Sequence, residues 1–428
     1  MYTSGFRRFK EKYLAKGSFK AHAFTVMSGM IIVNAIPVLT GPMLARLYTP
    51  SDFGTYAVCT ALIAIIATIG CARYEMAIML PKDDADSINL VVISIFFSSI
   101  LFLVILLVSY TSGKFISRLL ANPEIARWLY AVAISVILTN VFQAISHWLI
   151  RKKHFKALSI SRVLRSGVSA ATQLGMGVFH YGVLGLILGN IAGLITAVLI
   201  RLKEFFQEIR SHKRSVLALK KMMMLAARYK DFPKYDMAGS MINLLAMYFP
   251  VILFSSFFGS MVTGHYALTQ RMLLVPVSLI SLSIGDVYKQ RASSDYLAQG
   301  SCRAIFMKTF KSLCLLAVLP FLVLLFIGPQ LFSFIFGDRW RMAGEYAQIM
   351  SVLLFFKLTI SPLYFTLYVA NKQNYRLVWS VLLFVFTTTA FFVGVYFKSP
   401  KISVLCFSIA YSMMYILLFF LGYKFSKK

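Results

Sequence analysis

The sequence predicts an all-α polytopic membrane protein, with about twelve transmembrane helices in two six-helix bundles and both chain ends on the cytoplasmic side. Hydrophobic residues make up 59% of the 428 residues and charged residues only 14%, whereas a soluble domain has about 25% charged residues. The apolar stretches are continuous and do not alternate with polar residues, which indicates helices and not a β-barrel. A strongly basic segment near the middle of the chain, residues 201–236, separates two apolar halves.

Twelve apolar segments are each close to the roughly 20 residues that a helix needs to cross about 30 Å of hydrocarbon. The first segment is longer than the apolar part of a cleavable signal peptide, which is about 7–15 residues, so an uncleaved span is expected. The twelve expected spans are residues 22–44, 53–72, 88–110, 128–150, 157–179, 183–200, 237–258, 265–285, 312–333, 346–369, 377–397 and 402–423.

The distribution of lysine and arginine predicts the orientation. The chain carries a net charge of +29, with 44 Lys and Arg against 15 Asp and Glu. In a soluble protein this excess would suggest nucleic acid, but here the hydropathy assigns it to cytoplasmic loops and to contact with anionic membrane lipid, and no nucleic acid is expected. With the N-terminus inside, the inside segments hold 34 of the 44 cations and the outside loops hold 8. Basic loops mark the cytoplasmic face, so both termini are expected there.

The expected domain organisation is an N-terminal bundle over residues 1–200, a cytoplasmic basic linker over 201–236 and a C-terminal bundle over 237–428. The linker carries ten Lys or Arg residues. A short Gly-x-Tyr-Ala motif opens the second span of each half, at residues 54–57 and 264–267. This weak internal repeat and the central linker together suggest two parallel halves, an architecture found among transporters.

Several kinds of site are not expected. The five cysteines form no Cys-x-x-Cys pair and no metal-ligand spacing, so the sequence predicts neither a disulfide nor a metal site. The phosphate-binding signature Gly-x-x-x-x-Gly-Lys-Ser/Thr does not occur, which argues against ATP as the direct energy source. No cofactor is therefore expected, and coupling to a proton or sodium gradient is the alternative.

Two blocks in the first half carry a family resemblance. PMLARLYTPSDFGTYAV at residues 42–58 and ARYEMAIMLPKDD at residues 72–84 resemble the N-terminal signature of bacterial polysaccharide biosynthesis flippases. These proteins are the Wzx-type branch of the multidrug/oligosaccharidyl-lipid/polysaccharide exporter superfamily. The second half agrees through YKDFPKYD (229–236), FFGSMVTGHYALTQRMLLVPVSLI (257–280) and FGDRWRMAGEYAQIM (336–350).

The resemblance implies a flippase for an undecaprenyl-diphosphate-linked oligosaccharide in the bacterial inner membrane, serving synthesis of O-antigen, capsule or exopolysaccharide. It implies alternating access between two bundles around a cationic cavity, with a glycan polymerase and a chain-length regulator as further partners. Two other functions stay open. A multidrug cation antiporter of the same superfamily would need intramembrane carboxylates, and a glycan polymerase, which is an enzyme, would need a large outside loop. Acidic residues are expected only at span ends and no such loop is predicted, which disfavours both.

A diphosphate cargo needs cations inside the membrane, because its roughly two negative charges are costly in hydrocarbon unless they are paired. Lys357 is expected near the middle of span ten, about 16 Å from its start. There it could bind the cargo or, by losing its proton, take part in ion coupling; the alternative is a lysine that faces a water-filled groove. Arg271 is expected about 9 Å into span eight, either at the site or extended to the interface. Arg46 ends span one and either lines the outer mouth or anchors the helix.

Further candidates lie at the predicted inner face. Arg73 and Glu75 end span two; being two residues apart, they should not share a helix face and should pair with other helices, as a gate. Arg162 and Arg165 are three residues apart, so they share a face at the start of span five and could bind the diphosphate. Asp286 closes span eight and is a candidate gating or ion-coupling group beside a nearby cation. Anchoring at the membrane surface is the alternative for the arginines, and simple solvation is the alternative for Asp286.

Overall fold

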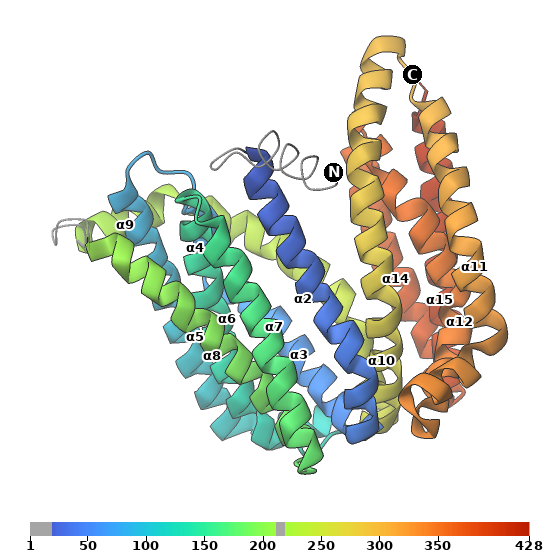
Figure 1. Cartoon of the computed structure of the whole chain (residues 1–428), viewed down its shortest axis with the longest axis horizontal. Coiled ribbons are helices and arrows are strands. Elements are labelled where there is room, and N and C mark those ends of the chain that lie inside the picture. Colours follow the sequence, from blue (N-terminus) through green and yellow to red (C-terminus); the bar gives the residue numbers. More distant parts are fainter. Residues whose placement is uncertain (1–18, 211–218, 428) are drawn as a thin grey trace, which may run out of the picture. The chain divides into compact units, whose positions relative to one another are not determined.

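The computed structural model describes residues 19–210 and 219–427, and Figure 1 shows that they are helical almost throughout. Within these two ranges the chain has no β-strand, only one isolated bridge between Ser301 and Lys427. The predicted helical class is therefore confirmed. The basic start before residue 19 and the part of the basic segment at 211–218 lie outside the described residues.

The elements are given in chain order. They are α2 (Phe19–Leu47), α3 (Pro50–Gly70), α4 (Tyr74–Ala77), α5 (Asp84–Leu119), α6 (Ile125–Arg151), α7 (Phe155–Val178), α8 (Val183–Arg210), α9 (Leu219–Arg228), the π-helix η2 (Phe232–Asp236), α10 (Met237–Gln299), α11 (Arg303–Phe336), the 3₁₀-helix η3 (Asp338–Trp340), α12 (Arg341–Ile360), the 3₁₀-helix η4 (Ser361–Phe365), α13 (Thr366–Val369), α14 (Gln373–Tyr396) and α15 (Pro400–Phe425).

Ten helical stretches of the described chain are long and apolar enough to span a membrane, where the sequence predicted about twelve spans. The difference has two physical causes. α7 coincides with the fifth predicted span, but its arginines, serines and glutamine keep it out of the apolar set. α10 joins the seventh and eighth predicted spans and is interrupted only at Gly259, whose φ of 81° and ψ of 177° are not helical. The loop expected at residues 258–264 is therefore a kink in a helix.

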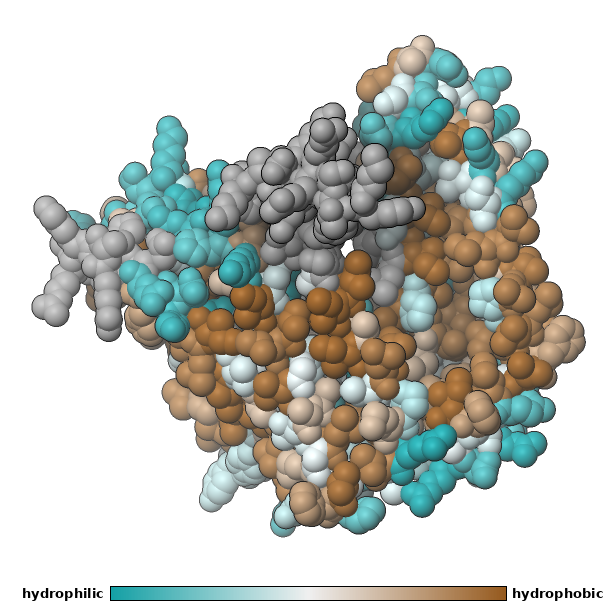
Figure 2. All heavy atoms as spheres, in the orientation of Figure 1, coloured by the Kyte–Doolittle hydropathy of each residue, from teal (hydrophilic) through white to brown (hydrophobic). Residues whose placement is uncertain are grey.

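The surface has the pattern of a multi-pass membrane protein. Figure 2 shows hydrophobic residues over the middle of the helices and hydrophilic residues gathered near their ends. Many large apolar side chains lie exposed along the spans, among them Leu103, Leu107 and Phe326. Such exposure is unfavourable in water and favourable against lipid.

Contacts divide the chain into two compact units, the first ending at Ser256 and the second beginning at Phe257. The predicted second bundle begins earlier, at residue 237. In the first unit α7 packs against α8 and α2, α5 packs against α6, and α6 packs against α3 and α8. The start of α3 explains part of the family-like block, because Thr49 and Asp52 form a reciprocal capping box around Pro50.

The second unit depends on close approach of helix backbones. α11 packs against α12, and a Cβ at Gly344 would lie 2.5 Å from the carbonyl oxygen of Gly328. α14 packs against α15, where a Cβ at Gly394 would lie 2.1 Å from the backbone nitrogen of Ser403. Small residues permit such contacts between membrane helices. α12 also packs against α15, so it contacts both α11 and α15.

Candidate functional site: an arginine cluster in the first unit

The predicted basic linker begins with a residue that is not in a loop. α8 continues through Arg201 to Arg210, and the rest of the described segment forms α9 and η2. Arg201 is fully buried. Residues at four-residue spacing on α8, from Gly189 through Gly193 to Arg201, therefore form one buried stripe along the helix.

The buried stripe of α8 packs against a matching stripe of residues on α7. A Cβ at Gly189 would lie 2.4 Å from the Gln173 side chain, and one at Gly193 would lie 2.5 Å from the carbonyl oxygen of Arg165. At the end of the stripe the Arg201 Nε donates to Ser161 Oγ at 2.8 Å. The α8 glycines thus let the two helices touch, and this contact positions Arg201 beside α7.

The Arg201 guanidinium is held by neutral groups. Its Nη1 donates to the Phe142 carbonyl oxygen at 2.8 Å and to Ser146 Oγ, and its carbon lies 3.5 Å from the centroid of the Phe142 ring. Its Nη2 is buried and has no hydrogen-bond partner among the described residues. A buried charged donor without a partner is rare in a structural role and marks a candidate binding group.

Arg162 and Arg165 of α7 complete the cluster. Both interact electrostatically with Arg201, and the Arg165 guanidinium lies 5.1 Å from the same Phe142 ring. In the part of the chain that the structure describes, no carboxylate forms an ion pair with any of the three arginines. The structure therefore brings together two predicted residues and one that the sequence analysis assigned to the linker. We call Arg162, Arg165 and Arg201 the arginine cluster.

The arginine cluster can bind an anion. Guanidinium groups match phosphate oxygens through paired N–H donors, and no carboxylate of the described chain pairs with these three. His147, on α6, interacts electrostatically with both Arg201 and Arg73, so the positive region extends toward the end of α3. Deep cations without acidic partners are unfavourable unless a ligand or water offsets their charge.

Arg73 and Glu75 contact each other directly, contrary to the expectation from helical spacing. Arg73 Nη1 lies 3.4 Å from Glu75 Oε1, and Arg73 Nε lies 2.6 Å from Asp236 Oδ2 of η2. The cause is the backbone: Ala72 and Arg73 have φ of 47° and 60°, which interrupts the helix between the end of α3 at Gly70 and the start of α4 at Tyr74. The expected pairing with another element does occur, through Asp236.

Glu75 is the most buried acid of this group. Its side chain is 3% exposed, and its Oε2 has no hydrogen-bond partner among the described residues. Burial raises the pKa of Glu75 above its ordinary value, and the nearby Arg73 offsets only part of this effect.

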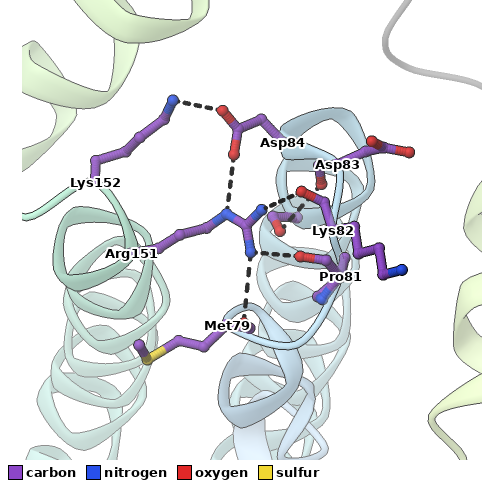
Figure 3. Close-up of polar contacts among 8 residues, drawn as sticks. Met79, Pro81, Lys82, Asp83, Asp84, Arg151 and Lys152 are labelled. Atoms are coloured by element: carbon purple, nitrogen blue, oxygen red, sulfur yellow. Dashed lines mark hydrogen bonds and ion pairs between the residues drawn. The ribbon is translucent and has the colours of Figure 1, made fainter.

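The turn that carries Glu75 toward α5 is clamped by α6. Figure 3 shows Arg151 reaching into the turn, where its Nη1 donates to the Pro81 carbonyl oxygen at 2.7 Å and its Nε to Asp84 Oδ1 at 2.9 Å. Lys152 Nζ binds the other carboxylate oxygen of Asp84 at 2.5 Å. The Pro-Lys-Asp-Asp end of the family-like block is therefore fixed by ionic contacts to Asp84 and by backbone contacts.

Lys357 lies in the second unit, one turn before a break in its span. α12 ends at Ile360 and is followed by η4, and the Ser361 N–H donates to the Lys357 carbonyl oxygen. Lys357 Nζ lies 3.4 Å from the Tyr411 hydroxyl and 5.4 Å from its ring centroid. Among the described residues no carboxylate lies within ion-pair distance of it. A cation in the last turn of an interrupted helix is stabilised by the exposed carbonyl groups there.

Three predicted residues are not part of the arginine cluster: Arg46, Arg271 and Asp286. Arg46 is exposed in the last turn of α2, and Arg271 is half-buried on α10. Asp286 is exposed and pairs with Lys289 at 2.9 Å, as its predicted neighbouring cation. Arg271 and Lys357 sit at different levels, because Thr269 of α10 bonds to Ala343 near the start of α12.

Comparison with known proteins identifies the family and the fold of the chain. A family model described as "Polysaccharide biosynthesis protein" matches residues 43–345. The succinoglycan biosynthesis transport protein ExoT of Rhizobium meliloti (strain 1021) is 22% identical over 309 residues, which are 71% of this chain and 60% of that protein. The chain thus spans about three fifths of the length of this curated relative.

Two solved structures share the fold. The lipid II flippase MurJ in an inward closed conformation matches with a TM-score of 0.71 at 13% identity, over 93% of this chain and 87% of that one. An inward-facing multidrug resistance MATE family transporter of the MOP superfamily matches with a TM-score of 0.68 at 14% identity, over 94% and 97%. These identities establish the fold alone. Since the family model covers well over half of the residues, the chain belongs to the polysaccharide biosynthesis protein family that its residues 42–84 predicted, with the fold of the MOP superfamily.

Proposed function

We propose that the chain is a flippase that moves an undecaprenyl-diphosphate-linked oligosaccharide across the bacterial inner membrane by alternating access. Its product would serve O-antigen, capsule or exopolysaccharide synthesis. The family membership and the transport role of its succinoglycan relative support a transporter and not an enzyme. The orientation with both termini in the cytoplasm, and the two six-helix halves joined by the basic segment, belong to the same proposal.

The observation that carries the proposal is the arginine cluster. Three guanidinium groups gather on α7 and α8, and no carboxylate of the described residues forms an ion pair with them. The buried Nη2 of Arg201 has no hydrogen-bond partner among these residues. A diphosphate supplies the charge and the acceptor oxygens that this arrangement lacks. Lys357, beside the break in α12, is the corresponding cation of the second unit and is proposed to contact the cargo or the coupling ion. We further propose that an ion gradient drives the cycle.

A multidrug cation antiporter is the second candidate, supported by the fold shared with the multidrug transporter. A cationic drug would be repelled by the arginine cluster, because like charges in a low-dielectric setting interact strongly. The two functions therefore predict opposite responses to removal of these arginines.

The test is transport into liposomes that contain the purified protein. The cargo is a fluorescent polyprenyl-diphosphate oligosaccharide, and quenching from outside measures the rate of flipping. Arg162→Gln with Arg165→Gln should lower the initial rate at least about tenfold, because a charge-assisted hydrogen bond contributes about 1.5–3 kcal/mol. Lys203→Gln, which removes an exposed cation from the same α8, is the matched control and should change it little. An unchanged rate in the double variant would reject the assigned diphosphate site, and faster export of a cationic dye would favour the antiporter.

The second unit is tested in cells. Lys357→Ala or Arg271→Ala should abolish surface glycan while the protein still accumulates in the membrane. Normal glycan with both variants would remove these two residues from the proposed site.

A further inference from the structure

A polar pocket of about 350 Å³ lies in the second unit, far along the chain from the arginine cluster. It is formed by the end of α11, the start of α12 and the start of α15. α11 and α12 touch at Gly328 and Gly344 beside the pocket, and its lining includes Pro329, which follows Gly328, and Gln348, one turn after Gly344. Figure 2 shows hydrophilic residues gathered at this end of the unit.

The charges of the pocket favour an anion. Arg341 and Lys401 face one carboxylate, Glu345. Lys401 Nζ lies 2.6 Å from Glu345 Oε2, so the carboxylate is already neutralised. The Arg341 side chain is exposed and makes no hydrogen bond or ion pair with any residue that the structure describes. The pocket therefore keeps one surplus positive charge and one guanidinium ready to bind.

The lining changes from polar to apolar along the helices. Arg341 and Lys401 stand near the beginnings of apolar spans, at Asp338–Val369 and Pro400–Phe425. Phe326 and Ile349 line the opposite end, and Phe326 is 70% exposed. Ile349 follows Arg341 by eight residues, so the pocket extends about 12 Å from the charged end into the apolar part of the span. An occupant must be anionic at one end and apolar at the other.

We propose that this pocket binds one anionic phospholipid at the membrane boundary. Arg341 and Lys401 hold the phosphate and the upper part of an acyl chain lies against Phe326 and Ile349. Phosphate recognition by Arg and Lys at the end of a membrane helix combines charge-assisted hydrogen bonds with attraction to anionic lipid. The pocket shares no residue with the proposed cargo site, so the proposal stands whether or not the chain is a flippase.

The test uses the full chain purified in detergent, with phosphatidylglycerol or phosphatidylcholine added and lipid adducts counted by native mass spectrometry. Phosphatidylglycerol should bind in preference to phosphatidylcholine. Arg341→Gln should weaken its binding about tenfold, which corresponds to about 1.4 kcal/mol. Glu345→Gln should strengthen binding, because it releases Lys401 from its ion pair and raises the net positive charge of the pocket. Arg339→Gln is the matched control, an exposed arginine two residues away that does not line the pocket.

Three outcomes would overturn the proposal. Equal binding of phosphatidylcholine would show that the headgroup charge is not recognised. Equal losses in Arg339→Gln and Arg341→Gln would show diffuse attraction and no specific site. Competition of inorganic phosphate with phosphatidylglycerol at similar concentrations would make the pocket a free-anion site, because the apolar end would then contribute nothing.

Discussion

Arg201 is a buried charge, and the two serines that bind it have hydrogen-bond partners without it. Ser161 Oγ donates to the Leu158 carbonyl oxygen, and Ser146 Oγ donates to the Phe142 carbonyl oxygen, so both serines already have partners within their own helices. The guanidinium adds a charge to this buried contact, and no acid among the described residues forms an ion pair with it. Burying such a charge is unfavourable, and replacement by an apolar residue of similar volume is often stabilising.

The first prediction concerns this residue. Arg201→Met should raise the free energy of unfolding by about 1–4 kcal/mol, because it removes the uncompensated charge and leaves no orphaned donor. The same change should lower the transport rate if the guanidinium binds the cargo, as residues kept at the expense of stability commonly serve function. Thermal melting of the detergent-purified protein and liposome transport measure the two effects. A less stable variant would show that Arg201 is structural.

Glu75 gives a prediction about pH. Its pKa in the folded protein is raised by burial, so the folded state holds its proton more tightly than the unfolded state. This contribution is present at acid pH and is lost as the pH rises through the raised pKa, above the ordinary glutamate value of about 4.3. Glu75→Gln should therefore gain melting temperature relative to the natural protein as the pH rises toward neutrality.

The control for Glu75 is another glutamate in an ion pair. Glu124→Gln removes an acid whose side chain is 48% exposed beside Arg127, and exposed pairs contribute little. Its melting temperature should follow that of the natural protein at every pH. A constant difference between Glu75→Gln and the natural protein across the pH range would show that Glu75 does not titrate within it.

At the scale of the element, α7 and α8 show how a sequence pattern becomes a site. Gly189, Gly193 and Arg201 lie four and eight residues apart on α8, so they share one face, which is opposite a polar stripe of α7. The glycines remove the side chains that would separate the helices. The position of Arg201 therefore depends on the glycines about two and three turns earlier.

The third prediction compares two glycines. Gly193→Ala places a methyl group 2.5 Å from the Arg165 carbonyl oxygen, so the helices must separate and the protein should lose stability. Gly167→Ala, on α7, meets nothing within 4 Å and should stabilise by up to about 1 kcal/mol through its helix propensity. Thermal melting of the two variants measures both signs. Equal effects would show that close packing of α7 and α8 is not what Gly193 provides.

The elements also show where sequence reasoning stops. Span positions follow from hydropathy, so most helices lie near their predicted ranges. The α8 spacing was available as a signal for Arg201, but its place at the end of an apolar run beside many cations led to its assignment to the linker. The prediction that Arg73 and Glu75 would not face each other was wrong. Their contact depends on two left-handed backbone positions that composition does not indicate. The break at η4 beside Lys357 was not predicted either, although Pro362 offered a signal.

At the scale of the whole molecule, the class and the family could be predicted because both rest on properties summed over many residues. Hydropathy indicated the membrane, and the blocks at residues 42–58 and 72–84 indicated the family. The candidate site could be predicted only in part. Arg162 and Arg165 share one helix and were paired by spacing, whereas Asp236 and Phe142 join their partners from distant parts of the chain. Such contacts depend on tertiary packing, for which a single sequence carries no direct signal.

The crossing of α7 decides the topology of the whole chain. It has 24 residues, which makes it about 36 Å long and sufficient to span the bilayer. It is too polar to count as a span by composition, yet it packs along both α2 and α8 (Figure 1). Its polar stripe is satisfied inside the first unit, as in Gln173, which is buried and bonded to the Leu186 carbonyl oxygen. Because neighbouring helices shield these groups from lipid, we expect α7 to cross the membrane.

The fourth prediction tests this crossing with single cysteines in the full chain, after replacement of the five native cysteines by alanine. Lys156→Cys lies in the first turn of α7 and Tyr181→Cys in the turn after it, and both side chains are exposed. A membrane-impermeant maleimide should label Tyr181→Cys in intact cells and Lys156→Cys only after permeabilisation, because the basic segments should face the cytoplasm. Labelling of both from the same side would mean that α7 does not cross. The chain would then have an odd number of spans, and its two ends would lie on opposite faces of the membrane.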